Sequence, residues 1–124
     1  MQDGKYVILC IDDDPDYLFA LKSVLEDGGY VYLSAPSAET GLKIYKDHHP
    51  DLVIVDLMME EVDAGIGFVK DLQAMGNTAP VYMLSSVGDS LNVAADYSSL
   101  GLAGVFQKPT DNEKLLSVLA AKLR

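Results

Sequence analysis

The sequence predicts an α/β fold, with a five-stranded parallel sheet and helices on both of its faces. Strand and helix signals alternate five times along the chain. Four short apolar runs bounded by turn residues have the length of strands buried on both faces, and they span residues 7–11, 52–55, 81–84 and 105–107. A chain of 124 residues suits one core, so residues 1–124 are expected to form a single domain.

The first strand, 7–11, leads into a helix that is expected to begin at Asp14-Pro15. Asp14 can cap the helix, and proline suits the first helical position. The paired glycines Gly28-Gly29 end it. Leucines at helical spacing mark its buried face: Leu18, Leu21 and Leu25.

The second strand and the second helix follow directly. Residues 30–34 alternate well enough to form an edge strand. Pro36-Ser37 opens the helix, and its inward face carries Ala38, Leu42 and Tyr45. This helix is expected to end before His48-His49-Pro50, because the residue before a proline avoids the helical region. The two histidines are expected in a solvated loop.

Three further helices accompany the last three strands. One carries Phe68, Val69, Leu72 and Met75 and stops at Gly76. The next begins at residue 89 or 90 and ends near residue 101. Residues 110–113 have the spacing of a capping box, in which Thr110 caps the last helix. The inward side chains of that helix are expected to be Leu115, Leu116, Leu119 and Leu123.

The charge and the single cysteine restrict the class of protein. The net charge is −10 and the pI is about 4.3, which argues against binding nucleic acid through a broad basic surface or binding an anionic membrane. One cysteine, Cys10, excludes an internal disulfide and is expected in the core. No signal peptide and no membrane-spanning run of ~20 apolar residues is evident, so a cytoplasmic protein is expected.

Reactive side chains follow the predicted strands. Asp12 and Asp13 come after the first, Asp56 after the third, Ser85 after the fourth and Lys108 after the fifth. Groups beyond the carboxyl ends of parallel strands line one crevice, so these five side chains are expected to meet. Clustered carboxylates require a cation, and hard oxygen ligands suit Mg²⁺ or Mn²⁺. A metal and a lysine beside an ionised carboxylate would support phosphoryl transfer to that carboxylate, giving an aspartyl phosphate.

With these motifs in place, the chain resembles the receiver domain of two-component response regulators over nearly its whole length. The segments that carry the resemblance are ILCIDDDP (8–15), PDLVIVDLMM (50–59), PVYMLSS (80–86) and GVFQKP (104–109). The resemblance implies a flavodoxin-like (βα)5 fold with strand order 2-1-3-4-5.

The resemblance also implies roles for the site residues. Asp56 would accept a phosphoryl group from a sensor histidine kinase or a histidine phosphotransfer protein. Mg²⁺ would be held by Asp13 directly, by Asp12 through water, by Asp56 and by the backbone carbonyl of Met58. Self-phosphorylation and autodephosphorylation would be the only chemistry, so the protein is not expected to be an enzyme in the usual sense.

The same resemblance assigns the readout of phosphorylation. Ser85 would move toward the phosphoryl group, Lys108 would pair with it, and the Lys108-Pro109 peptide would be cis. The surface of the fourth helix, fifth strand and fifth helix would then change and meet an output protein or domain. Formation of a homodimer linked to phosphorylation is left open, as is whether the chain is a stand-alone receiver or part of a longer regulator.

The sequence departs from the family pattern at three places. The segment 59–65 lacks the usual proline and is one residue longer, so this loop is expected to have its own shape. Val105 stands where many receivers carry a switching aromatic, and Phe106 should point to the opposite face of the sheet. Met58 and Val87 are apolar and are expected to hinder the water that hydrolyses the phosphoryl group, giving a slowly decaying phosphorylated state.

Three alternatives remain at this point. A haloacid dehalogenase-like phosphatase would also form an aspartyl phosphate, but residue 16 is Asp where that family has Thr or Val, and no second acidic cluster follows Lys108. A flavodoxin-like cofactor carrier would need a phosphate-binding loop after the first strand, where the acidic cluster stands. A receiver that works without phosphate would not need the complete set of site residues.

Overall fold

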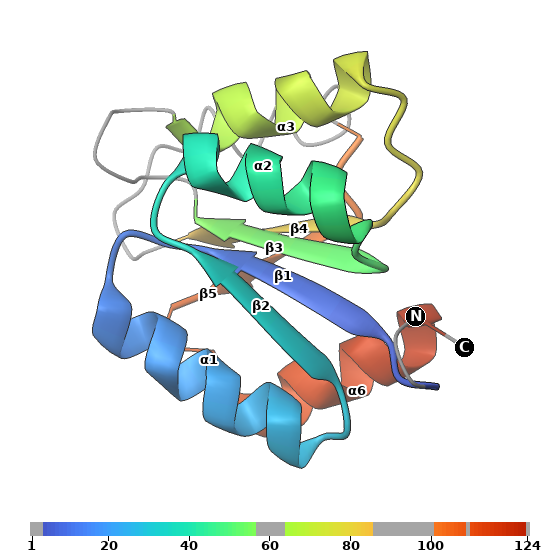
Figure 1. Cartoon of the computed structure of the whole chain (residues 1–124). Coiled ribbons are helices and arrows are strands. Elements are labelled where there is room, and N and C mark those ends of the chain that lie inside the picture. The colour runs from blue at the N-terminus through green and yellow to red at the C-terminus, as the bar shows by residue number, and fades with distance from the viewer. Residues whose placement is uncertain (1–3, 57–63, 86–100, 109, 124) are drawn as a thin grey trace.

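The computed structural model describes residues 4–56, 64–85, 101–108 and 110–123, and over these residues the chain is a parallel sheet between two layers of helices (Figure 1). The strand order is β2-β1-β3-β4-β5, which confirms the predicted fold class and order. The strands are β1 (Val7–Ile11), β2 (Val31–Ala35), β3 (Leu52–Asp56), β4 (Val81–Ser85) and β5 (Gly104–Gln107). The helices are α1 (Pro15–Asp27), α2 (Ala38–His48), α3 (Ala64–Ala74) and α6 (Asn112–Leu123). The helix expected from residue 89 or 90 to residue 101 lies almost wholly outside the described residues.

The central strands are buried on both faces, as their continuous apolar sequences predict. Every residue of β1 and β3 is buried. Alternate side chains form two separate cores, since successive residues of a strand point to opposite faces. One core, which includes Leu9, Val55 and Met83, lies under α2 and α3, and the other, which includes Ile8, Cys10 and Ile54, lies under α1 and α6 (Figure 1).

The two N-terminal helices begin where the sequence predicts. The side chain of Asp14 caps α1 by accepting hydrogen bonds from the backbone N–H groups of Asp16 and Tyr17, at 3.0 and 3.4 Å. Ser37 caps α2 in the same way, through the N–H of Thr40 at 3.2 Å. No helix in the described part of the chain combines the length and apolar character that a bilayer crossing requires.

Some element boundaries differ from the prediction. The edge strand begins at Val31 rather than at Tyr30, because the N–H of Tyr30 bonds to the carbonyl of Leu25 and so closes the turn after α1. Helix α2 continues to His48, and the exposed His49 ends it in the left-handed conformation, with φ +46°.

Met75 lies outside α3, contrary to the prediction. The helix ends at Ala74, and Gly76, with φ +77°, turns the chain away. Met75 is 41% exposed and does not belong to the core.

The predicted capping box of the last helix is wrong. Asp111 caps α6, since its carboxylate accepts from the N–H of Lys114 at 3.1 Å. The Thr110 hydroxyl instead accepts a hydrogen bond from the hydroxyl of Tyr17, at 3.0 Å. Thr110 and Asp111 are both residue types that can cap a helix. The Thr110 hydroxyl is engaged by Tyr17 of α1, and Asp111 is the cap.

Candidate functional site

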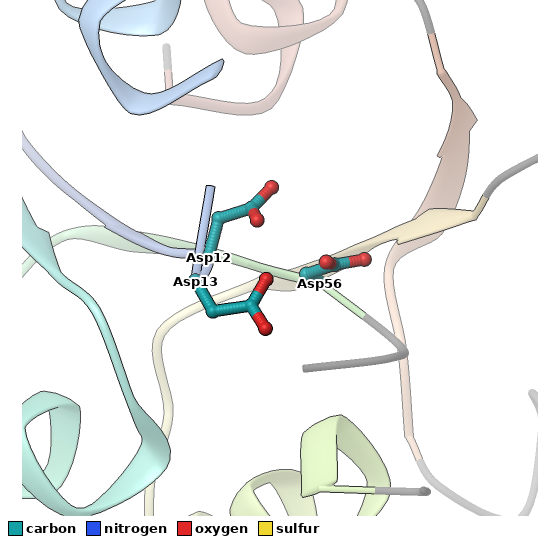
Figure 2. Close-up of side chains that lie close together, drawn as sticks. All are labelled: Asp12, Asp13 and Asp56. Atoms are coloured by element: carbon teal, nitrogen blue, oxygen red, sulfur yellow. The ribbon is translucent and has the colours of Figure 1, made fainter. Parts of the chain in front are cut away.

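The three acidic residues of the predicted site lie together at the carboxyl ends of β1 and β3. Asp12 and Asp13 follow β1, and Asp56 is the last residue of β3. The two strands are neighbours, with Ile11 opposite Val55, so the acidic residues converge (Figure 2). One carboxylate oxygen from each residue lies within 4.8 Å of the others.

Asp12 is fully buried and fixed by hydrogen bonds. One carboxylate oxygen accepts from the N–H of Asp14 at 3.0 Å, and the other accepts from Lys108 Nζ at 2.7 Å. Its own N–H donates to the carbonyl of Ala35 at 3.2 Å. Because both oxygens already have partners, Asp12 shapes the site more rigidly than the exposed Asp13 does.

Lys108 reaches the acidic cluster from the end of β5. Its ammonium lies 2.7 Å from Asp12 and 3.2 Å from Asp56. The backbone N–H of Lys108 donates to the carbonyl of Ser85 at 2.7 Å, which ties the end of β5 to the end of β4. Burial alone would lower the pKa of Lys108, but the hydrogen bond and charge of Asp12, with those of Asp56, raise it overall.

Asp56 is 4% exposed, and its pKa is shifted by burial and by the charges of its neighbours. Burial raises the pKa of this carboxyl, the negative charge of Asp12 raises it further, and Lys108 opposes both effects. The result is a pKa of about 6 in the absence of a metal ion. A buried carboxyl with a raised pKa beside a lysine is typical of a reactive group.

The structure also brings in a residue that the sequence did not single out. Lys108 Nζ lies 4.5 Å from the centre of the Tyr17 ring, within the range of a cation–π interaction. Burial raises the pKa of Tyr17, more than Thr110 and Lys108 lower it, so its hydroxyl keeps its proton. The only sequence signal for Tyr17 is its position one turn into a helix that starts beside the acidic cluster.

The remaining predicted site residues have different outcomes. Ser85, half-buried, is the last residue of β4, one position beyond the partner of Asp56 in the sheet. Met58 lies outside the described residues, and so do Val87, Pro109 and most of the segment 59–65. The prediction for β5 is confirmed: Phe106 packs in the core under α1 and α6, and Val105 packs on the opposite face.

The donor set fits a hard divalent cation. Three carboxylates and one ammonium leave an excess of two negative charges when all are ionised. Carboxylate oxygens are the ligands that Mg²⁺ and Mn²⁺ prefer, and the exposed Asp13 leaves room for the waters that Mg²⁺ retains. A concavity of about 540 Å³ that includes Thr78, Ala79 and Lys122 contains none of these groups.

Comparisons with known proteins agree with this geometry. The family described as "Response regulator receiver domain" matches residues 8–120. The probable transcriptional regulator ycf27 of Porphyridium aerugineum is 38% identical over 85 residues, and the transcriptional regulatory protein GlrR of Escherichia coli (strain K12) is 32% identical over 112 residues. The chain spans 35% and 25% of these two proteins, which correspond to 68% and 90% of the chain.

Relatives of similar length and solved structures also match. An uncharacterized 14.6 kDa protein of Leptolyngbya boryana is 32% identical over 114 residues, covering 90% of this chain and 86% of that protein. The chemotaxis protein CheY4 of Vibrio cholerae is 26% identical, with a TM-score of 0.85 over 97% of this chain and 100% of that one. None of these matches supports the phosphatase alternative. The chain therefore belongs to the receiver domain family of two-component response regulators, whose members act as phosphoacceptor switches in signal transduction.

Proposed function

We propose that Asp56 is the phosphoacceptor of this receiver, and that a sensor histidine kinase or a histidine phosphotransfer protein supplies the phosphoryl group. The observation that carries the proposal is the position of the Asp56 carboxylate. It is buried, lies 3.2 Å from the Lys108 ammonium, and shares a cluster with Asp12 and Asp13.

Asp12, Asp13, Asp56 and the backbone carbonyl of Met58 would hold Mg²⁺ or Mn²⁺, and the described carboxylates provide the support for this assignment. When bound, the ion supplies positive charge beside the reacting oxygens. Asp13, the exposed member, is the ligand expected to bind directly, while the fully hydrogen-bonded Asp12 is expected to act through water.

In the transfer step, an oxygen of Asp56 attacks phosphorus as the bond from phosphorus to the donor imidazole nitrogen breaks. The electron pair of that bond leaves with the imidazole, and an acyl phosphate forms on Asp56. Lys108 would neutralise charge on the transferred group, and the 3.2 Å contact between its ammonium and Asp56 supports this role. The Ser85 hydroxyl would donate a hydrogen bond to a phosphoryl oxygen. Later attack of water on phosphorus would release phosphate and return Asp56 to its free carboxylate.

The output surface is assigned to residues 89–101 together with β5 and α6. Phosphorylation would shift a two-state equilibrium of this surface and so alter its contacts with an output protein or domain, or with a second receiver in a homodimer. Because Val105 is aliphatic and Phe106 is packed on the other face, an aromatic flip at position 105 is not part of the proposal. We place this receiver in the cytoplasm as one domain over 1–124, without nucleic-acid or membrane binding of its own.

The test is intact mass spectrometry after incubation with acetyl phosphate and Mg²⁺. The wild-type chain should gain one phosphoryl group, and Asp56→Asn should gain none or much less. Asp47→Asn, which changes an exposed carboxylate of α2, is the matched control and should behave as wild type. Chelation of Mg²⁺ should stop the reaction.

An equal mass gain in Asp56→Asn would overturn the proposal. Sustained hydrolysis of a phosphate ester, beyond one turnover per molecule, would favour a phosphatase instead. The lifetime of the mass gain also tests the prediction that Met58 and Val87 slow hydrolysis, since loss of the label within seconds would contradict it.

A further inference from the structure

Tyr17 joins two parts of the site that are distant in sequence. Its N–H is held by the Asp14 side chain at the start of α1, next to the acidic cluster. Its hydroxyl donates to Thr110, 93 residues further along the chain, at 3.0 Å. Thr110 comes two residues after Lys108 and directly before Asp111, the residue that caps α6. One side chain therefore connects the start of α1 with the segment that carries Lys108 into α6.

The contact of the Tyr17 ring with Lys108 differs in kind from the contacts that the carboxylates make. Two of the close contacts of the Lys108 ammonium are with Asp12 and Asp56, and both carboxylates are also proposed to serve a metal ion or the phosphoryl group. A further contact is with the ring of Tyr17, whose centre lies 4.5 Å from Nζ. The ring attracts the ammonium, but it is neither a ligand for hydrated Mg²⁺ nor the proposed phosphoacceptor. The contact between Lys108 and the ring can therefore persist when the contacts with Asp12 and Asp56 change.

The surroundings of Tyr17 keep the ring in place. Tyr17 is half-buried and packs against the core under α1 and α6, while its hydroxyl is fixed to Thr110. The Lys108 side chain is 18% exposed, and a flexible four-carbon stem would otherwise be free to turn toward solvent.

From these contacts we infer that Tyr17 is a positioning residue for Lys108: its ring holds the ammonium at the phosphoacceptor site, and its hydroxyl links that position to the start of α6. The inference rests on the proposed function of Asp56 and Lys108. Tyr17 itself is not expected to touch the phosphoryl group.

Four variants separate the ring from the hydroxyl and from general packing. Tyr17→Phe keeps the ring and loses the bond to Thr110, whereas Tyr17→Leu loses both. Tyr32→Phe and Tyr32→Leu are matched controls, because Tyr32 is also half-buried on the α1 face and its hydroxyl donates to Leu18, at 2.8 Å, rather than contacting the site.

The first measurement is the NMR shift of the Lys108 side-chain protons in unphosphorylated protein. The ring should move these signals upfield in the wild type and in Tyr17→Phe, and the displacement should disappear in Tyr17→Leu. The second measurement is the rate of mass gain from acetyl phosphate with Mg²⁺. Tyr17→Leu should be about two- to tenfold slower, and Tyr17→Phe should retain most of the rate. Both Tyr32 variants should match the wild type in both measurements, even where urea unfolding shows that they are less stable.

The inference is overturned if Tyr17→Leu keeps the wild-type Lys108 shifts and labelling rate, or if Tyr32→Leu slows labelling as much. It is also overturned if Tyr17→Phe loses as much rate as Tyr17→Leu, since the ring would then not be the determinant. These outcomes differ from failure of the proposed function, in which Asp56→Asn still takes the label whatever the Tyr17 variants do.

Discussion

At the scale of single residues, the site is a balance of charge around Lys108. The ammonium contacts two buried carboxylates, and the same carboxylates are proposed to hold a metal ion, Asp56 directly and Asp12 through water. If this proposal holds, the lysine and the metal ion compete for Asp12 and Asp56 in the unphosphorylated protein, and both neutralise negative charge once the phosphoryl group is present. Lys108 can reach both carboxylates because it follows β5. Only β4 separates β5 from β3, the strand that carries Asp56.

Replacing Lys108 with methionine should raise the affinity for Mg²⁺ but lower the rate of phosphorylation. Lys108→Met keeps a long stem but removes the positive charge, so Mg²⁺ should bind several-fold more tightly to the freed carboxylates. Labelling by acetyl phosphate should slow by about a hundredfold, because one preorganised cation is lost from the transition state. Titration calorimetry and intact mass measure the two effects.

Lys114→Met is the control for that change. Lys114 is exposed on α6, so the substitution alters the net charge equally without touching the site. Weaker Mg²⁺ binding in Lys108→Met would contradict the competition and would mean that the lysine organises the carboxylates for the metal.

At the scale of elements, close packing of helices on the sheet places the strand ends. Helix α2 approaches β1 at Gly41, where an added Cβ would lie 2.7 Å from Ile11 Cδ1 and 3.2 Å from Phe68 Cε1. Ile11 is the residue directly before Asp12, so the packing under α2 bears on the site through the end of β1.

Gly41→Ala should therefore destabilise the protein by about 1–3 kcal/mol, in spite of the better helix propensity of alanine. Urea unfolding measures the change. Gly67→Ala is the matched control, since Gly67 is an exposed helical glycine with nothing within 4 Å of an added Cβ, and it should be neutral or slightly stabilising. Equal effects of the two substitutions would mean that Ile11 and Phe68 can move aside without cost.

The sequence was sufficient for the five strands, for the existence of the four described helices and for the acidic cluster, because these follow from hydrophobic patterns and from the geometry of a parallel sheet. Apolar runs such as 7–11 predict buried strands, and parallel strands bring Asp12 and Asp56 to one edge. The sequence was insufficient where two neighbouring residues could both cap a helix, as Thr110 and Asp111 could at the start of α6. Tyr17 was missed because its contact with Lys108 depends on how α1 sits beside the end of β5, which no local pattern encodes.

At the scale of the whole molecule, we expect the buried acidic site to lower the free energy of unfolding, and a bound metal ion to restore part of it. The folded-state pKa of Asp56, about 6, is above its ordinary value of 3.8, so the folded protein binds more protons than the unfolded chain between these values. The free energy of unfolding should thus fall as the pH rises through this window in the absence of metal. The net charge of −10 acts in the same direction through self-repulsion.

Thermal unfolding with and without Mg²⁺ tests this balance. Mg²⁺ should raise the melting temperature more at pH 7.5 than at pH 5, because a carboxylate must lose its proton to bind the ion. Asp56→Asn should show a weaker fall in stability between pH 4 and pH 6, and a smaller response to Mg²⁺, than the wild type. If wild type and Asp56→Asn have parallel pH profiles, Asp56 is not the group responsible.

The strand order has a consequence for how the molecule is made. Since the order is β2-β1-β3-β4-β5, each strand that leaves the ribosome can add to an open edge of the strands already present, and none must be inserted between two others. Lys108 follows the last strand. The nascent domain would thus carry its buried acidic pair without the positive charge of Lys108 until β5 has been made, so the arrival of β5 both completes the described sheet and relieves part of the electrostatic penalty.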